Sequence, residues 1–167
     1  MSIKMKKGLQ YIIILFVWAT CQSCLDKGLE VPSFDPVAQF VYDTTIIEQY
    51  LNENGIIALQ APSGLRYVLH TPGAGESPEP IDTVTVSYSG RILGEEEDFD
   101  SGENVEFPLR FTIIGWQIGM QYVKEGGSIT LYIPSGQAYA NVGSGNTIPP
   151  NVVLEFDVEL HKIGTDN

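Results

Sequence analysis

Residues 139–158 read YANVGSGNTIPPNVVLEFDV, and this stretch is the most informative part of the chain. It begins with the phenol of Tyr139, places the branched Ile148 before two prolines, and ends in an apolar–polar alternation that contains Phe156. Ligand pockets are lined mainly by aromatic and aliphatic side chains with a few polar groups. The stretch therefore predicts the rim and wall of one small apolar pocket, next to the last strand of a sheet.

Four earlier segments alternate in the same way. Together with the last one, the alternating runs are residues 65–69, 84–92, 107–113, 129–133 and 152–160. A period of two is typical of strands with one covered and one solvated face. These runs predict an antiparallel sheet of five to six strands.

A single short helix is expected to cover this sheet. Trp116, Met120 and Val123 lie at positions i, i+4 and i+7 and so share one helical face. Gly119 on this segment would let the backbone approach the sheet closely, and Gly126 would end the helix. A sheet half-wrapped around one helix predicts an α+β domain with a single core.

A second helix is expected before the domain. Ile46, Ile47, Tyr50 and Leu51 have helical spacing, with Asp43 or Thr44 as the N-cap and Gly55 at the end. The helix either packs on the following domain or serves as a docking surface for a partner or a second copy. Residues 24–60 would thus form a tether and this short amphipathic helix, followed by a domain at residues 61–165.

The N-terminus has the pattern of an export signal. Three lysines precede the apolar residues 12–19, a run far shorter than the roughly 20 residues of a membrane-spanning helix. Cys21 and Cys24 follow, and a small residue before a cysteine at this point resembles a bacterial lipobox. Because Ser23 is smaller than Thr20, we predict a lipoprotein signal peptide at residues 1–23 and acylation of Cys24. Acylation of Cys21 is one alternative, since position −3 to Cys24 is Cys21 rather than the usual leucine, and a plain signal peptide with incidental cysteines is another.

The charge of the chain excludes several functions. The formal charge is −12, and loss of residues 1–23 removes three lysines and no acids, which makes it −15. A chain this acidic is not expected to bind nucleic acid through phosphates. With His70 and His161 as its two histidines, the chain has no cluster with metal-ligand spacing, so no metal is expected. The acidic run at residues 95–98 follows Gly94 and is interpreted as a solvated hairpin tip.

Taken in order, a set of short motifs resembles the FKBP family of peptidyl-prolyl cis/trans isomerases over about residues 63–163. Each motif alone is weak, but the series is specific. The motifs are Tyr88-x-Gly90, Phe99-Asp100-Ser101, Phe107-x-Leu109, Ile113-x-Gly115-Trp116, Gly126, Ala138-Tyr139, Ile148-Pro149-Pro150 and Phe156-Asp157-Val158-Glu159-Leu160.

The resemblance implies a fold, a reaction and a set of site residues. It implies a pocket that binds the prolyl ring and aids rotation of the X–Pro bond without a cofactor. The residues implied as catalytic are Tyr88, Asp100, Tyr139 and Phe156. The residues implied in substrate binding are Phe99, Thr112, Ile113, Trp116, Ala138 and Ile148.

Some positions depart from the family pattern. Ala140 replaces a usual glycine, Val105 stands where an aromatic residue often flanks the pocket, and Thr147 replaces an apolar residue. These changes affect the rim more than the floor of the pocket.

Two functions therefore stay open. The first is an isomerase of exported proteins, lipid-anchored in the cell envelope after export through the general pathway. The second is a proline-segment binding module or envelope chaperone with little or no turnover. The expected partners are proline-containing polypeptides, macrolide inhibitors and, through the lipid anchor, a membrane.

Overall fold

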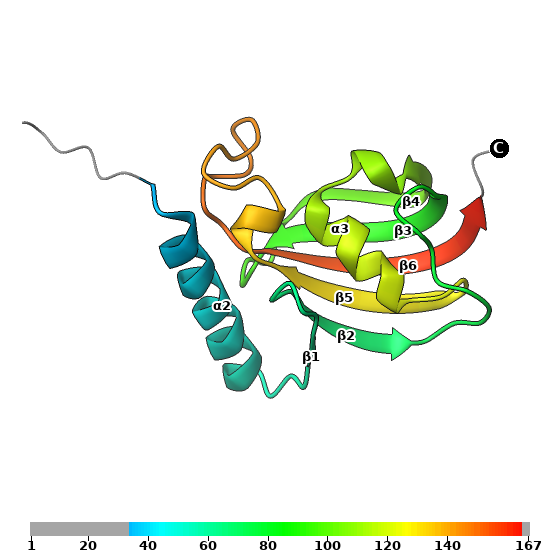
Figure 1. The fold of residues 1–167 in the computed structure, drawn as a ribbon, viewed down its shortest axis with the longest axis horizontal. Helices are drawn as coiled ribbons and strands as arrows, with labels where there is room; N and C mark the ends of the chain where they lie inside the picture. The colour runs from blue at the N-terminus through cyan, green and yellow to red at the C-terminus, as the bar shows by residue number, and fades with distance from the viewer. Residues whose placement is uncertain (1–33, 165–167) are drawn as a thin grey trace, which may run out of the picture. The chain divides into compact units, whose positions relative to one another are not determined.

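The computed structural model describes residues 34–164, and a six-stranded sheet forms the centre of this part (Figure 1). The strands have the order β1-β2-β5-β6-β3-β4, and all neighbours are antiparallel. They are β1 (Leu59–Gln60), β2 (Arg66–Thr71), β3 (Thr83–Ile92), β4 (Asp98–Pro108), β5 (Gly127–Ile133) and β6 (Leu154–Gly164). The α+β prediction with five to six antiparallel strands is confirmed. The predicted signal segment, Cys21 and Cys24 lie outside the described residues.

One predicted strand, residues 107–113, is wrong in its extent. Strand β4 ends at Pro108, and Leu109–Phe111 form the 3₁₀ turn η1 instead. Proline has no N–H for a ladder hydrogen bond, so a strand tends to end there. Thr112 then closes the turn, because both its N–H and its hydroxyl donate to the Leu109 carbonyl, at 3.0 and 2.7 Å.

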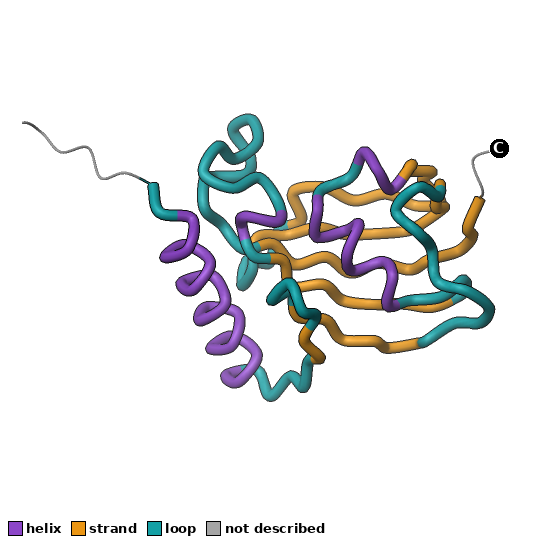
Figure 2. The backbone as a smooth tube through the Cα atoms, viewed as in Figure 1, coloured by secondary structure: helices purple, strands orange, loops and turns teal. Residues whose placement is uncertain are grey.

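The predicted covering helix is present as α3 (Ile114–Gly119), continued by the 3₁₀ turn η2 (Met120–Tyr122). Figure 2 shows this helical segment on one face of the sheet. The three residues with helical spacing, Trp116, Met120 and Val123, are all buried in the core. A Cβ atom built on Gly119 would lie 2.6 Å from the Leu131 side chain, so only glycine lets the helix lie this close to β5.

Helix α2 (Pro36–Glu53) precedes the sheet and starts earlier than predicted. Its N-cap is Asp35, whose carboxyl group accepts hydrogen bonds from the N–H groups of Val37 and Ala38. An aspartate followed by proline is a strong start signal, because proline at the first helical position gives up no hydrogen bond. The prediction of Asp43 or Thr44 as the cap is therefore wrong, and residues 36–42 are helical rather than part of a tether.

Helix α2 packs against the sheet face opposite to α3. Ile47 and Leu51 are buried in a cluster with Tyr132 and Val153. Tyr132 alternates along β5 with Leu131 and Ile133, which belong to the main core on the α3 side. The helix thus packs on the domain, as the first interpretation of its pattern predicts. Within residues 34–164, no helix has the length and hydropathy to span a membrane.

Candidate active site

A cavity of about 280 Å³ opens on the α3 side of the sheet. Strands β3, β4 and β6, the segment from η1 to α3, and the loop before β6 all contribute to its wall. The lining residues are Tyr88, Phe99, Asp100, Phe107, Phe111, Thr112, Ile113, Trp116, Tyr139 and Phe156. Asp100 is the only carboxylic acid among them, so the cavity is apolar with one acidic group at its edge.

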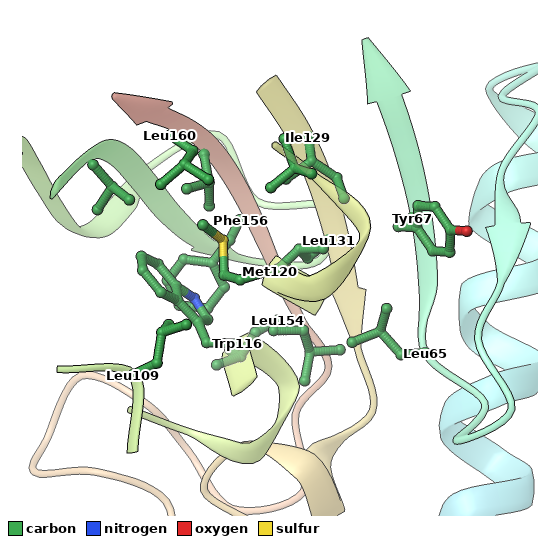
Figure 3. Close-up of a cluster of buried hydrophobic side chains, with 14 of the residues drawn as sticks. Leu65, Tyr67, Leu109, Trp116, Met120, Ile129, Leu131, Leu154, Phe156 and Leu160 are labelled. Carbon is green, nitrogen blue, oxygen red and sulfur yellow. The ribbon is translucent and has the colours of Figure 1, made fainter. Parts of the chain in front are cut away.

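Trp116 lies at the centre of the aromatic lining. Its indole meets Tyr88, Phe107 and Phe156 edge to face, with ring centroids 5.4, 5.8 and 5.4 Å apart. Figure 3 shows Trp116 and Phe156 within the main cluster of buried side chains. Edge-to-face pairs are favoured by the charge distribution of aromatic rings. Each ring is thus held by its neighbours, and the cavity keeps its shape without a ligand.

Gly90 in strand β3 leaves room for two phenyl rings from the neighbouring strands, Phe99 of β4 and Phe156 of β6. It is paired with Asp100 on one side and Phe156 on the other. A Cβ atom at Gly90 would lie 2.4 Å from the Phe156 ring and 3.0 Å from that of Phe99. Because glycine leaves this space empty, the two rings meet over the strand at a centroid distance of 5.6 Å. The Tyr88-x-Gly90 motif therefore has a packing reason.

The polar edge of the cavity consists of Tyr88 and Asp100. The Tyr88 hydroxyl donates a 2.8 Å hydrogen bond to the Asp100 carboxyl group. Burial, followed by this hydrogen bond, raises the pKa of Tyr88 to about 12. The phenol therefore stays protonated through the physiological range and keeps its role as the donor to Asp100.

Two further groups can meet a bound carbonyl. Ile113 is the N-cap of α3, and no acceptor for its N–H is found within residues 34–164. Tyr139, on the loop before β6, also lines the cavity. The segment before α3 is held by Gln117, whose side chain donates a 2.8 Å hydrogen bond to the Thr112 carbonyl.

Eight of the ten site residues named from the sequence line the cavity, and two do not. Ile148 is buried in the core, and Ala138 packs against that core. Phe107 and Phe111 line the cavity but were missed. The alternation of residues 107–113 indicated Phe107 as a covered residue. Phe111 belongs to the same predicted run, but η1 turns it to the surface, where it is 78% exposed under the Arg110 guanidinium.

The rim departures have different consequences. Val105 and Thr147 are not among the lining residues. Ala140 has a φ of +49°, the left-handed conformation that the usual glycine would adopt without strain. Its N–H donates to the Ser135 carbonyl at 2.8 Å, and its carbonyl accepts from the Asn151 N–H at 2.7 Å. These bonds hold Ala140 in a strained conformation.

Ala140→Gly is expected to stabilise the protein by about 0.5–1 kcal/mol. The substitution removes the cost of the left-handed conformation, about 1–2 kcal/mol. Glycine also gives the unfolded chain more conformational freedom, which destabilises the folded state by about 0.4–1 kcal/mol and offsets part of the gain. Urea unfolding followed by circular dichroism measures the difference. Ala74→Gly is the control, because Ala74 is exposed and has no positive φ, so this change should destabilise. Destabilisation by both variants would contradict strain at Ala140.

No group of three or more His, Cys, Asp or Glu side chains in the described part of the chain could hold a metal ion. The geometry instead defines a class of site: a preformed aromatic cavity for a small apolar ring, with a few hydrogen-bonding groups at its edge.

Comparison with known proteins identifies the family. The family model of the FKBP-type peptidyl-prolyl cis-trans isomerases matches residues 74–161. The chain therefore belongs to the FKBP-type peptidyl-prolyl cis-trans isomerase family.

Among curated proteins, the chain is 45% identical over 123 residues to the probable FKBP-type peptidyl-prolyl cis-trans isomerase FkpA of Neisseria meningitidis. The match covers 70% of this chain and 45% of that protein. The FkpA of Escherichia coli is 40% identical over 116 residues, which cover 68% of this chain and 42% of that protein. The chain thus spans less than half the length of these curated relatives.

Solved structures agree with this assignment. A peptidyl-prolyl cis-trans isomerase of Pseudomonas syringae superposes with a TM-score of 0.68 at 28% identity, covering 79% of this chain and 98% of that chain. The crystal structure of Escherichia coli FkpA gives a TM-score of 0.67 at 30% identity, with coverage of 98% and 75%.

Proposed function

We propose that this protein catalyses cis/trans isomerisation of X–Pro bonds in exported polypeptides. The observation that supports it is the aromatic cavity of about 280 Å³ around Trp116, with Asp100 as its one acidic lining residue. Such a cavity suits a prolyl ring, which is small, apolar and rigid. X–Pro isomerisation takes tens to hundreds of seconds without a catalyst, slow enough to limit folding.

Rotation of the prolyl amide breaks no bond, so the site needs no nucleophile. The barrier of about 18–20 kcal/mol arises because rotation destroys amide resonance. The planar amide is more dipolar and better solvated by water than the twisted one. A dry cavity formed by Trp116, Phe99 and Phe156 removes that solvation and so favours the twisted state.

Polar groups at the edge then fix the substrate. In this proposal the Ile113 N–H and the Tyr139 hydroxyl donate to the carbonyls on either side of the prolyl ring. Asp100 orients Tyr88 through their hydrogen bond and places negative charge beside the twisting amide. Each group acts by position or charge, and none has to gain or lose a proton.

The location is part of the same proposal. The lysines and apolar run before residue 20 support export, and Ser23-Cys24 supports lipid attachment in the cell envelope. With acylation of Cys24, the acyl chains alone would hold this acidic protein at a membrane.

A binding module without useful turnover is the second candidate. The observations that favour it are the strained Ala140 next to Tyr139 and the exposed Phe111 at the rim. Such a module would use the same cavity to hold proline-containing segments.

The test is isomerisation of short Xaa-Leu-Pro-Phe peptides, with a macrolide inhibitor added to the same sample. Trp18→Phe leaves Trp116 as the sole tryptophan, so its fluorescence reports inhibitor binding. Turnover that the inhibitor abolishes, with a change in fluorescence, supports the isomerase. A fluorescence change without turnover supports the binding module. The absence of both signals would contradict a functional proline pocket.

A further inference from the structure

Asp43 on helix α2 has an unusual environment. Its side chain is fully buried, whereas Tyr42 before it is exposed and Thr44 after it is half-buried. One carboxyl oxygen, Oδ2, accepts hydrogen bonds from the Ser135 N–H at 2.8 Å and the Ser135 hydroxyl at 2.6 Å. The other, Oδ1, accepts from the Gln39 side chain at 2.6 Å. A buried carboxyl group is costly unless it is well hydrogen-bonded, and three donors satisfy this one.

Ser135 connects this carboxyl group to the rim of the cavity. It begins the 3₁₀ turn η3 (Ser135–Gln137), which follows β5 and leads directly to Tyr139. The Ser135 carbonyl accepts the N–H groups of Ala138 and Ala140, at 2.9 and 2.8 Å. These two residues flank Tyr139. Figure 1 shows α2 beside the loop that joins β5 to β6.

We propose that Asp43 is a positioning residue for the isomerase site, which it reaches through Ser135 from a helix outside the sheet. The inference rests on the proposed function, since it assigns Tyr139 a role in turnover. Asp43 fixes the N–H and hydroxyl of Ser135, and Ser135 fixes the backbone on both sides of Tyr139. The helix before the sheet is therefore part of the catalytic unit.

Because the backbone of Ala140 is strained, contacts from other residues must keep it in its left-handed conformation. A left-handed alanine persists only where the surrounding structure imposes it, and the Ser135 carbonyl is one of the groups that hold Ala140. Without Asp43, the buried N–H and hydroxyl of Ser135 would lose their acceptor. The turn would then move to find another partner, and Ala140 and Tyr139 would move with it. Displacement of a substrate-positioning group by about 1 Å can cost up to 100-fold in rate.

The experiment compares Asp43→Ala with Asp43→Asn and a matched control in the full-length chain. Asparagine can still accept from Ser135 through its amide oxygen, while the Gln39 amide turns over to accept from the new NH₂ group. Leu51→Ala is the control, because Leu51 is buried on the same helix but packs against Tyr132 and Val153. Ser135→Ala is a second test, because it removes the hydroxyl and keeps the N–H.

We expect Asp43→Ala to lower kcat/KM for X–Pro peptides by about tenfold, and Asp43→Asn to restore most of it. Ser135→Ala should give an intermediate loss. Leu51→Ala should lower the melting temperature but leave kcat/KM unchanged at temperatures where it is folded. If Asp43→Ala and Leu51→Ala reduce kcat/KM alike, Asp43 only stabilises the helix, and the proposal is overturned.

A second readout does not depend on activity. With 3-fluorotyrosine at position 139, the ¹⁹F resonance reports the surroundings of this ring. It should shift or broaden in Asp43→Ala, return toward the wild-type position in Asp43→Asn, and stay unchanged in Leu51→Ala. If the wild-type protein shows no turnover, the proposed function is wrong. The ¹⁹F resonances of the variants still test whether Asp43 positions Tyr139. An unchanged resonance in both Asp43→Ala and Ser135→Ala overturns that link.

Discussion

Asp100→Ala is expected to lower kcat/KM for X–Pro isomerisation by about 100-fold, the loss typical of removing one preorganised electrostatic group. Asp100 is exposed, and its hydrogen bond to the Tyr88 hydroxyl is also exposed, so water can replace the carboxyl group as the acceptor. Exposed substitutions usually change stability by less than about 0.5 kcal/mol. The loss should therefore appear in turnover and not in the unfolding curve. A coupled peptide assay and urea unfolding of the same samples measure both quantities.

Two further variants separate the possible roles of Asp100. Glu103→Ala removes an equal charge from the same strand outside the cavity lining, and kcat/KM should not change. Tyr88→Phe removes the hydroxyl that Asp100 orients. If Asp100 acts through Tyr88, the double variant should be no slower than the slower single one. If its charge acts directly on the amide, the two losses should multiply. Unchanged kcat/KM in Asp100→Ala would rule out both roles.

The sequence predicted the parts of the structure that repeat regularly. Alternation is clear along β3 and most of β6 because one face of each strand lies on the main core. Strand β5 is buried on both faces, and its apolar residues Ile129, Leu131 and Ile133 mark the face on the main core. Trp116, Met120 and Val123 indicated the covering helix because their spacing survives the change from α3 to the 3₁₀ turn. The cavity lining was predictable to the same extent, since Phe156 belongs to such a strand and Trp116 to this helix.

The failures occur where a local signal was misread or missing. Strand β4 is largely exposed and contains the left-handed Asn104 with a register shift nearby, so it hardly alternates. Pro108 is a signal for the end of a strand, but the apparent alternation of residues 107–113 outweighed it. Phe111 was therefore placed in a strand instead of the turn η1. Ala138 and Ile148 pack in the core and do not line the cavity, so their predicted role in substrate binding stays a prediction.

Asp43 shows a different kind of limit. An aspartate before two threonines is typical of a helix N-cap, and that interpretation hid its position in the middle of α2. Its partner Ser135 lies 92 residues away in the sequence. No local pattern can reveal a buried hydrogen bond over that separation, so this contact required the structure.

Trp116→Ala is expected to cost about 3–5 kcal/mol of folding free energy, as for other buried aromatic residues. Trp116 is 4% exposed and contacts three aromatic rings edge to face. Its removal leaves a cavity and frees Tyr88, Phe107 and Phe156 to move. We also expect isomerisation to fall below detection, because the floor that receives the prolyl ring is gone. Trp116→Phe should retain part of both properties.

Loss of stability alone could abolish turnover, and Met120→Ala distinguishes this from loss of the floor. Met120 is fully buried and follows α3 directly, but it does not line the cavity. Its truncation should cost about 2–5 kcal/mol and leave kcat/KM nearly unchanged at a temperature where the variant is folded. At equal folded fraction, set by temperature and checked by circular dichroism, Trp116→Ala should be inactive and Met120→Ala active. Equal activity of the two folded variants would mean that Trp116 serves the core and not the site.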